Sequence, residues 1–241
     1  GISRVVLTSS VAASHHGSGR APFTERDWTD PQGPRATAYY RSKTLAEIAA
    51  WSAAADSGTE LAVINPGVIL GPIVTPRVGA SLGLVLGLLR GDLRRVPRFG
   101  FAVVDVRDAA SAHLAAMTAP AAINQRFLLG GETVWLRELS ARLARLRPEY
   151  AAALPRAQSP DWTVRLLALR DPKAREIVRE LGRDLGVDAR NARTRLGWSP
   201  RPLDETLTET VRALESFGHL APPTGPAGQR RRGAQPTGTP Q

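Results

Sequence analysis

Cysteine is absent from this chain of 241 residues. Without it there is no disulfide framework and no thiolate ligand for a structural metal. The four histidines, at positions 15, 16, 113 and 219, do not have the spacing typical of zinc ligands. We therefore expect no metal site.

Long apolar runs are also missing. A helix that spans a bilayer needs about 18 or more consecutive apolar residues, and the run "SLGLVLGLL" at residues 81–89 reaches about half of that length. The residues that follow Gly1 show neither the charged segment nor the apolar stretch of a secretory leader. These features predict a soluble, cytoplasmic protein that does not bind a membrane.

Lysine is scarce. Only Lys43 and Lys173 are lysines among the 32 basic residues, although the formal net charge is +10. Clustered basic side chains would favour nucleic acid, but the arginines are scattered among alanines, glycines and prolines, so we expect no nucleic-acid partner. The one tight cluster, "QRRRG", lies in a Pro- and Gly-rich stretch. We expect residues 221–241 to be a disordered basic tail, with a polyanion-binding arm as the alternative.

Strand-like and helix-like segments alternate along the rest of the chain, whose 42% apolar content suits a globular protein. Short apolar or β-branched runs predict strands at residues 4–8, 60–66 and 125–131, and a further short strand at the start of residues 101–120. Helical spacing predicts helices at residues 37–55, at residues 80–90, from about residue 107 onward and at residues 133–146. Thr133 is a possible N-cap of the last helix, and Asp108 suits the first turn of the third. This alternation favours a parallel sheet covered by helices.

The segment after residue 147 differs in its sequence pattern, because prolines interrupt its helical stretches. Its last helix carries an apolar stripe at spacings of 4, 4 and 3, formed by Leu203, Leu207, Val211 and Leu214. We expect this segment to be a smaller lobe beside the sheet. Ligands of open α/β sheets bind at the carboxyl ends of the strands, so the crevice between sheet and lobe is the expected substrate site.

The stretch "TAYYRSKTLAE" places Tyr39 and Lys43 four residues apart at the start of a predicted helix. Side chains at i and i+4 rise from the same helix face, a face that Tyr40 does not share. A phenol gives up its proton only near pH 10, and a nearby ammonium group favours the ionised form. A hydroxyl at the end of the first strand, from Ser9 or Ser10, could orient a carbonyl oxygen toward the phenol.

Four motifs, in order, are "VVLTSSVAA", "AYYRSKTLAEIAAW", "VINPGVILGP" and "VVDVRDAASAHLAAM". Together they resemble the extended short-chain dehydrogenase/reductase family, also called the NAD-dependent epimerase/dehydratase family. Within it, the chain is most similar to the dihydroflavonol-reductase-like aldehyde and ketone reductases. The resemblance covers about residues 3–217 and includes the C-terminal stretch "RTRLGWSPRPLDETL".

The resemblance implies an α/β fold class: the C-terminal portion of a Rossmann-type doubly wound parallel sheet, plus a small, mostly helical substrate lobe. Residues 1–147 would form the partial Rossmann-like domain, with substrate-lobe segments inserted around residues 71–100. Residues 148–220 would form the C-terminal lobe.

The same resemblance implies the roles of the catalytic residues. Ser10 would polarise the substrate carbonyl, Tyr39 would be the general acid, and Lys43 would favour the tyrosinate and bind the nicotinamide ribose. Tyr39 would also contact the cofactor, which the family takes as NADP(H) or NAD(H). The implied reaction reduces a small aldehyde or ketone to an alcohol.

Further residues are implied to bind the cofactor. Pro66, Gly67 and Val68 would line the nicotinamide pocket, and Ser81 would approach the cofactor. The sequence does not indicate the oligomeric state or the preference between NAD and NADP.

One family feature is missing from the sequence, the Gly-rich dinucleotide fingerprint that follows the first strand. On the family's plan the chain would begin at the fifth strand, so the N-terminal dinucleotide-binding half would be absent. We expect a fragment that is inactive alone, or a truncated product. A non-catalytic scaffold that senses a cofactor or binds a partner remains an alternative of another class.

Other activities of the same family are also alternatives. Ser10 is followed by Val11 and Ala12 rather than by the Asp-Glu pair of sugar-nucleotide dehydratases, so dehydration is disfavoured. Nucleotide-sugar epimerisation and hydroxysteroid-type dehydrogenation stay open behind carbonyl reduction. The nearby His15 and His16 are expected to lie in a solvated loop without a role.

Overall fold

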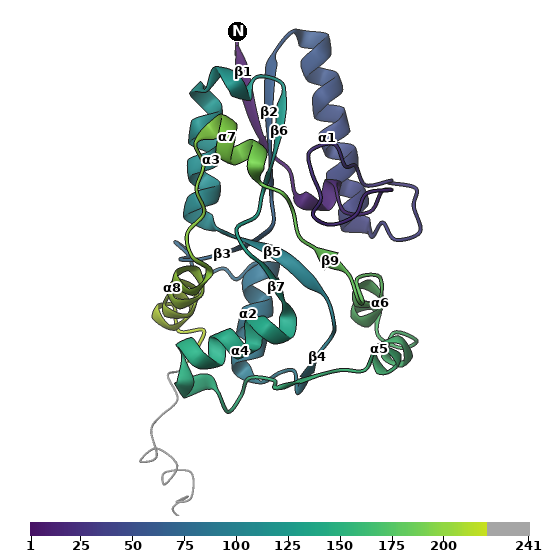
Figure 1. The fold of residues 1–241 in the computed structure, drawn as a ribbon, viewed down its shortest axis with the longest axis vertical. Helices are drawn as coiled ribbons and strands as arrows, with labels where there is room; N and C mark the ends of the chain where they lie inside the picture. The colour runs from purple at the N-terminus through teal and green to yellow at the C-terminus, as the bar shows by residue number, and fades with distance from the viewer. Residues whose placement is uncertain (221–241) are drawn as a thin grey trace, which may run out of the picture.

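The computed structural model describes residues 1–220, with the side chain of Lys173 excepted. The expected basic tail at residues 221–241 lies outside the described residues. Figure 1 shows two groups of strands stacked along the long axis of the molecule, each accompanied by helices.

The first group is a three-stranded parallel sheet. Its strands follow the order β1 (Arg4–Thr8), β2 (Glu60–Pro66) and β6 (Gln125–Leu129). Two of these strands are rich in β-branched residues, which pack well on a pleated surface. Because the strands are parallel, their carboxyl ends share one edge of the sheet. Within residues 1–220, β1 pairs with β2 alone.

Helices cover both faces of this sheet (Figure 1). Helix α1 (Ala38–Ser57) contacts β2 on one face, while α3 (Val106–Thr118) and α7 (Arg190–Leu196) lie on the other. The core between α3, α7 and the sheet is built largely from alanines, with Phe127 and Trp198 as its large side chains. Small residues on α3 let the helix approach the sheet closely.

The strands at residues 4–8 and 60–66 and the helix at residues 80–90 are confirmed with the predicted bounds. The helix predicted at residues 37–55 begins at Ala38, because the hydroxyl of Thr37 accepts a hydrogen bond from the backbone N–H of Tyr40 at 3.3 Å and caps the first turn. Asp108 lies in the first turn of α3, as predicted.

The second group of strands contains β3 (Val68–Leu70), β5 (Gly100–Asp105) and β7 (Thr133–Trp135). Strand β5 is parallel to β3 and antiparallel to β7, and β9 (Asp184–Leu185) also pairs with it. The helices of the apolar core here are α2 (Ala80–Arg90), α4 (Leu136–Leu146) and α8 (Leu203–Ser216). The predicted stripe on α8 is confirmed, since all four of its residues are buried.

Short elements connect these parts. Three are 3₁₀ turns at Val11–Ala13, Pro120–Ala122 and Pro148–Tyr150. The others are β4 (Arg95–Val96), β8 (Ala157–Gln158), α5 (Asp161–Leu167) and α6 (Pro172–Val178).

The prediction of Thr133 as a helix cap is wrong. Thr133 begins strand β7, and α4 starts three residues later with Trp135 at its N-cap position. The run Thr133–Trp135 is β-branched and aromatic, and it finds an antiparallel partner in β5. Tertiary pairing therefore overrides the local cap signal.

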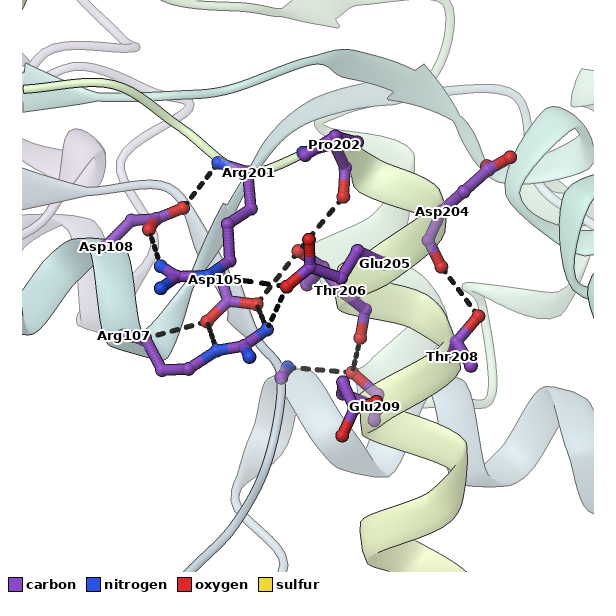
Figure 2. Close-up of polar contacts among 12 residues, drawn as sticks. Asp105, Arg107, Asp108, Arg201, Pro202, Asp204, Glu205, Thr206, Thr208 and Glu209 are labelled. Carbon is purple, nitrogen blue, oxygen red and sulfur yellow. Dashed lines mark hydrogen bonds and ion pairs between the residues drawn. The ribbon is translucent and has the colours of Figure 1, made fainter.

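A polar clamp joins the start of α3 to the last segment of the described chain (Figure 2). The carboxylate of Asp108 accepts hydrogen bonds from the backbone N–H of Arg201, at 2.7 Å, and from its guanidinium group. Asp105 accepts a hydrogen bond from the hydroxyl of Thr206 at 2.9 Å and pairs with Arg107. Burial opposes the charge of Asp105, but the hydrogen bonds from Arg107 and Thr206 outweigh it and hold its pKa below the ordinary value.

Within the described range, no helix combines the length and the apolar character needed to cross a membrane. No cluster of three or more potential metal ligands occurs among residues 1–220.

Candidate active site

A cavity of about 330 Å³ opens where β1 ends and α1 begins. Its lining comes from segments far apart in the sequence: Ser10, Val11, Ala12, His15, Tyr39, Tyr40, Gly67, Val68, Ala80, Ser81, Leu84, Phe99, Phe101, Ala102, Glu180 and Leu185. Most of this lining is apolar. Ser10 follows the carboxyl end of β1, and Glu180 and Leu185 come from the segment expected to form the lobe, so the cavity lies at the predicted crevice between sheet and lobe.

Ser10 is held in an extended conformation, with φ −164° and ψ 151°, as the N-cap of the 3₁₀ turn that follows β1. Its Oγ accepts a hydrogen bond from the backbone N–H of Ala12 at 3.1 Å. Tyr39 Oη donates to the same Oγ at 3.4 Å. The proton of the Ser10 hydroxyl is thus left available for an acceptor in the cavity. Ser9, the other candidate, turns its hydroxyl away to Glu47.

Tyr39 and Lys43 lie on the first turns of α1. The Tyr39 side chain is 56% exposed, so water reaches it. Lys43 is half-buried and makes no hydrogen bond or ion pair with any described residue. Its three N–H donors are therefore available to a ligand, such as the hydroxyls of a ribose.

Tyr40 lines the same cavity, although it does not share the helix face of Tyr39. Its ring packs edge-on against His16, with 4.3 Å between centroids. Burial, followed by the nearby carboxylate of Glu180, raises the pKa of Tyr40 well above its ordinary value. Tyr40 therefore stays protonated and is unsuited to an acid–base cycle.

Three of the predicted cofactor-binding positions, Gly67, Val68 and Ser81, line the cavity. Pro66 is buried at the end of β2 and is not part of the lining. Gly67 has a structural reason to be glycine, because a Cβ atom there would lie 2.5 Å from the carbonyl oxygen of Ala102. The close passage of this turn beside β5 is what brings Val68 to the cavity wall.

The prediction that His15 and His16 lie in a solvated loop is wrong. Both are buried, at 4% and 7% exposure, because the apolar turn Val11–Ala13 carries the chain inward after Ser10. Burial, then the charges of His16 and Arg183, lower the pKa of His15 to about 3. His15 thus presents a neutral imidazole to the cavity, and its Nε2 is buried without a hydrogen-bond partner among residues 1–220. The apolar run "VAA" was the sequence signal for this burial.

Residues from the distant segment 180–185 complete the cavity, and sequence reasoning missed them. His16 Nε2 lies 3.0 Å from Glu180 Oε1, and Arg183 Nη1 lies 2.6 Å from His16 Nδ1. Arg183 also donates to the backbone carbonyl of His15 at 2.7 Å. No local pattern in the sequence marks Glu180 as a neighbour of His16, because 164 residues separate them.

Comparison with known families gives a match over residues 1–130 to the family described as the NAD dependent epimerase/dehydratase family. Among curated proteins, cinnamoyl-CoA reductase 1 of Arabidopsis thaliana is 33% identical over 228 residues, which is 92% of this chain and 60% of the relative. A putative dihydroflavonol 4-reductase of Synechocystis sp. is 27% identical, over 91% of this chain and 66% of its own. The first of these relatives is thus matched over about 60% of its length.

Solved structures give the same picture. Gre2 of Candida albicans, in complex with NADPH, superposes with a TM-score of 0.69 at 25% identity, over 90% of this chain and 65% of that one. Vestitone reductase of alfalfa has the same fold, with a TM-score of 0.69 at 22% identity, over 90% of this chain and 66% of that one.

Proposed function

This chain belongs to the NAD dependent epimerase/dehydratase family, and from that premise we propose that it carries the catalytic centre of a reductase that uses NADP(H) or NAD(H) to convert an aldehyde or ketone into an alcohol. The observation that carries the proposal is the meeting of the Tyr39 and Ser10 hydroxyls, 3.4 Å apart, at the edge of a mainly apolar cavity. The ammonium group of Lys43, which has no partner among the described residues, stands one helical turn from Tyr39.

In the proposed reaction, Ser10 donates its free proton in a hydrogen bond to the carbonyl oxygen of the substrate and so polarises the carbonyl. A reduced nicotinamide, held by Lys43 and Tyr39, would supply the hydride that the carbonyl carbon accepts. Tyr39 gives its phenolic proton to the oxygen, which completes the alcohol. Because Tyr39 is more than half exposed, solvent can return this proton afterwards.

The residues present fit a nicotinamide ribose at this edge. Lys43 offers unpaired N–H donors and Tyr39 an accessible hydroxyl, the donor set that ribose hydroxyls accept. Val68 gives the neighbouring wall an apolar surface suited to the flat face of a ring. The Gre2 of Candida albicans was solved with NADPH, which favours NADP(H) over NAD(H).

The cavity favours an uncharged, largely apolar carbonyl compound over a nucleotide sugar. Five apolar side chains form much of its wall: Val68, Leu84, Phe99, Phe101 and Leu185. The carboxylate of Glu180 is already held by His16 and Arg183. A sugar buried here would leave several hydroxyls without partners, which is unfavourable. Reductases among the relatives point the same way.

The test is steady-state reduction of an aldehyde by the protein at the length that its gene encodes, with NADPH in excess. Tyr39→Phe should lower kcat by about a hundredfold or more, the usual scale for the loss of a general acid. Near-normal turnover by this variant would remove Tyr39 from the mechanism. A wild-type protein that binds NADPH but turns over no carbonyl compound would favour the scaffold alternative.

The matched control is Tyr150→Phe. Tyr150 is also a hydrogen-bonded tyrosine, which donates to Glu215 at 2.9 Å, but it lies outside the cavity lining. The Tyr150→Phe variant should have the kcat of the wild-type protein and a somewhat lower stability. Tyr40→Phe is a poor control, because Tyr40 lines the cavity and interacts with Glu180.

A further inference from the structure

A buried carboxylate lies behind the proposed catalytic residues. Glu47 is on α1, one turn beyond Lys43, and is fully buried. Its Oε1 accepts a hydrogen bond from Arg126 Nε at 2.6 Å, and its Oε2 accepts one from Ser9 Oγ at 2.5 Å. Asn65 Nδ2 donates to the same Oε2 at 2.7 Å. All three neighbours are donors, so an ionised carboxylate is the group that satisfies them together.

Arg126 makes this arrangement rigid. Its guanidinium donates to the backbone carbonyls of Glu25, at 2.7 Å, and Asp27, at 3.0 Å. It also lies over the ring of Trp28, 3.8 Å from the centroid. Glu47 and Arg126 therefore tie α1 and β6 to the loop between β1 and α1. A buried charge pair needs this many hydrogen bonds to offset its desolvation.

Asn65 connects this rigid network to Ser10. Its amide nitrogen has two N–H groups, and besides Glu47 it donates to the backbone carbonyl of Ser10 at 3.1 Å. That carbonyl belongs to the residue whose extended conformation aims Oγ at Tyr39. Rotation of the Ser10 peptide would move the hydroxyl away from the cavity.

The amide oxygen of Asn65 is unsatisfied within residues 1–220, so the main contribution of this side chain is the pair of hydrogen bonds that its nitrogen donates to Glu47 and Ser10. Its Oδ1 is buried and accepts no hydrogen bond in the described part of the chain. A buried amide with an unsatisfied oxygen is unfavourable compared with an apolar side chain of similar size. Its nitrogen, in contrast, is used twice.

We propose that Asn65 is a positioning residue, which holds the Ser10 peptide against the Glu47–Arg126 pair and so keeps the Ser10 hydroxyl aimed at the substrate carbonyl. This inference rests on the proposed function of Ser10 and Tyr39. Asn65 acts through Ser10 and does not itself touch the substrate.

Ser9 provides a matched comparison. Ser9→Ala and Asn65→Ala each remove one donor from the same oxygen of Glu47. Of these two side chains, that of Asn65 also donates a hydrogen bond to the backbone carbonyl of Ser10, whereas that of Ser9 donates to Glu47. If Asn65 had a purely structural role, turnover would fall in proportion to the lost stability in both variants. A positioning role predicts similar losses of melting temperature but unequal losses of turnover.

The experiment measures kcat, KM for the carbonyl substrate and melting temperature of the protein at its natural length. Asn65→Ala should lower kcat by about tenfold to a hundredfold, the scale of a small misplacement of a reacting group, while Ser9→Ala stays within about twofold of wild type. Asn65→Ser is a second version, since one hydroxyl proton can serve Glu47 or Ser10 but not both. It should lose turnover in the same way and retain more of the fold.

A double-mutant cycle gives the independent readout. In the background of Ser10→Ala, Asn65→Ala should lower kcat by no more than about twofold further, because its effect passes through the missing hydroxyl. Equal kcat losses for Asn65→Ala and Ser9→Ala, or additive losses in the cycle, would overturn the positioning role. If Tyr39→Phe and Ser10→Ala still lower kcat strongly in that case, the proposed function stands and only this inference fails.

Discussion

Tyr39 and Tyr40 are adjacent in the chain, but the fold gives them different environments. Tyr39 is exposed and its hydroxyl reaches Ser10, whereas Tyr40 packs on His16 and interacts with Glu180. The difference follows from helix geometry, since consecutive residues on a helix point about 100° apart. One tyrosine therefore suits proton transfer, and the other suits the wall of the cavity.

His15 should titrate far below the usual range for histidine. Burial, then the charges of His16 and Arg183, lower its pKa to about 3, so NMR should show a neutral His15 ring from pH 8 down to pH 5. The unfolded chain binds a proton below about pH 6.5 and the folded chain does not. The free energy of unfolding should therefore decrease as pH falls from about 6.5 toward 3, by at most about 1.4 kcal/mol per pH unit from this group.

Urea denaturation at pH 7 and pH 4.5 measures this slope. His15→Leu removes the titrating group and should flatten the dependence of stability on pH. An unchanged slope in this variant, or a His15 ring that titrates near pH 6, would contradict the assignment.

At the scale of the element, the turn between β2 and β3 decides the shape of the cavity. The backbone N–H of Gly67 donates to the carbonyl of Leu129 at 2.9 Å, and its Cα faces the backbone of Ala102. The turn can pass between these two backbones because residue 67 has no side chain. Asn65 and Val68 take their places on either side of it.

Gly67→Ala should destabilise the protein. The added Cβ would meet backbone atoms that cannot move aside easily, the nearest at 2.5 Å, and overpacking of this kind costs about 1 to 3 kcal/mol. Gly83→Ala is the control within α2, where the added Cβ would have no atom within 4 Å in the described residues apart from its chain neighbours and its own helix backbone. The control should be neutral or stabilising by up to about 1 kcal/mol, because alanine favours helix. Thermal melting of the two variants checks the difference, and a Gly67→Ala protein as stable as wild type would refute the close-approach argument.

At the scale of the whole molecule, the segment that begins at Trp198 returns to the first sheet and packs against it. Trp198 enters the core between α3 and α7 and donates its indole N–H to the backbone carbonyl of Asp108 at 2.9 Å. Three residues later, Arg201 binds the Asp108 carboxylate (Figure 2). Helix α8 then packs in the second core. The clamp thus joins both cores through the carboxylates of Asp108 and Asp105.

Asp108→Asn should lower the free energy of unfolding by about 1 to 3 kcal/mol. The variant loses the charge that pairs with Arg201, and we take less than the full cost of a broken buried pair because the Arg201 side chain is 37% exposed. Asp56→Asn, at the exposed C-terminal end of α1, is the control and should have no measurable cost. Urea denaturation measures both variants. Equal stability of the two would show that the clamp does not join the parts of the fold energetically.

Local patterns in the sequence determined much of this protein. The β-branched runs specified β1 and β2, the i, i+4 spacing specified the face of α1 that carries Tyr39 and Lys43, and the stripe beginning at Leu203 specified α8. These features depend on neighbours a few residues away, so the sequence alone displays them. The ordered motifs likewise indicated the family that the comparisons show.

The tertiary structure alone decided which polar groups meet. Whether Ser9 or Ser10 faces the cavity depends on Glu47, 38 residues from Ser9, and the burial of His16 depends on Glu180, 164 residues away. The same holds for Thr133, which lies in a strand because the run Thr133–Trp135 pairs with β5. Contacts of this kind are set by the three-dimensional path of the chain, because the two partners meet only when the whole fold forms. The local sequence periods of 2 and 3.6 residues therefore do not predict them.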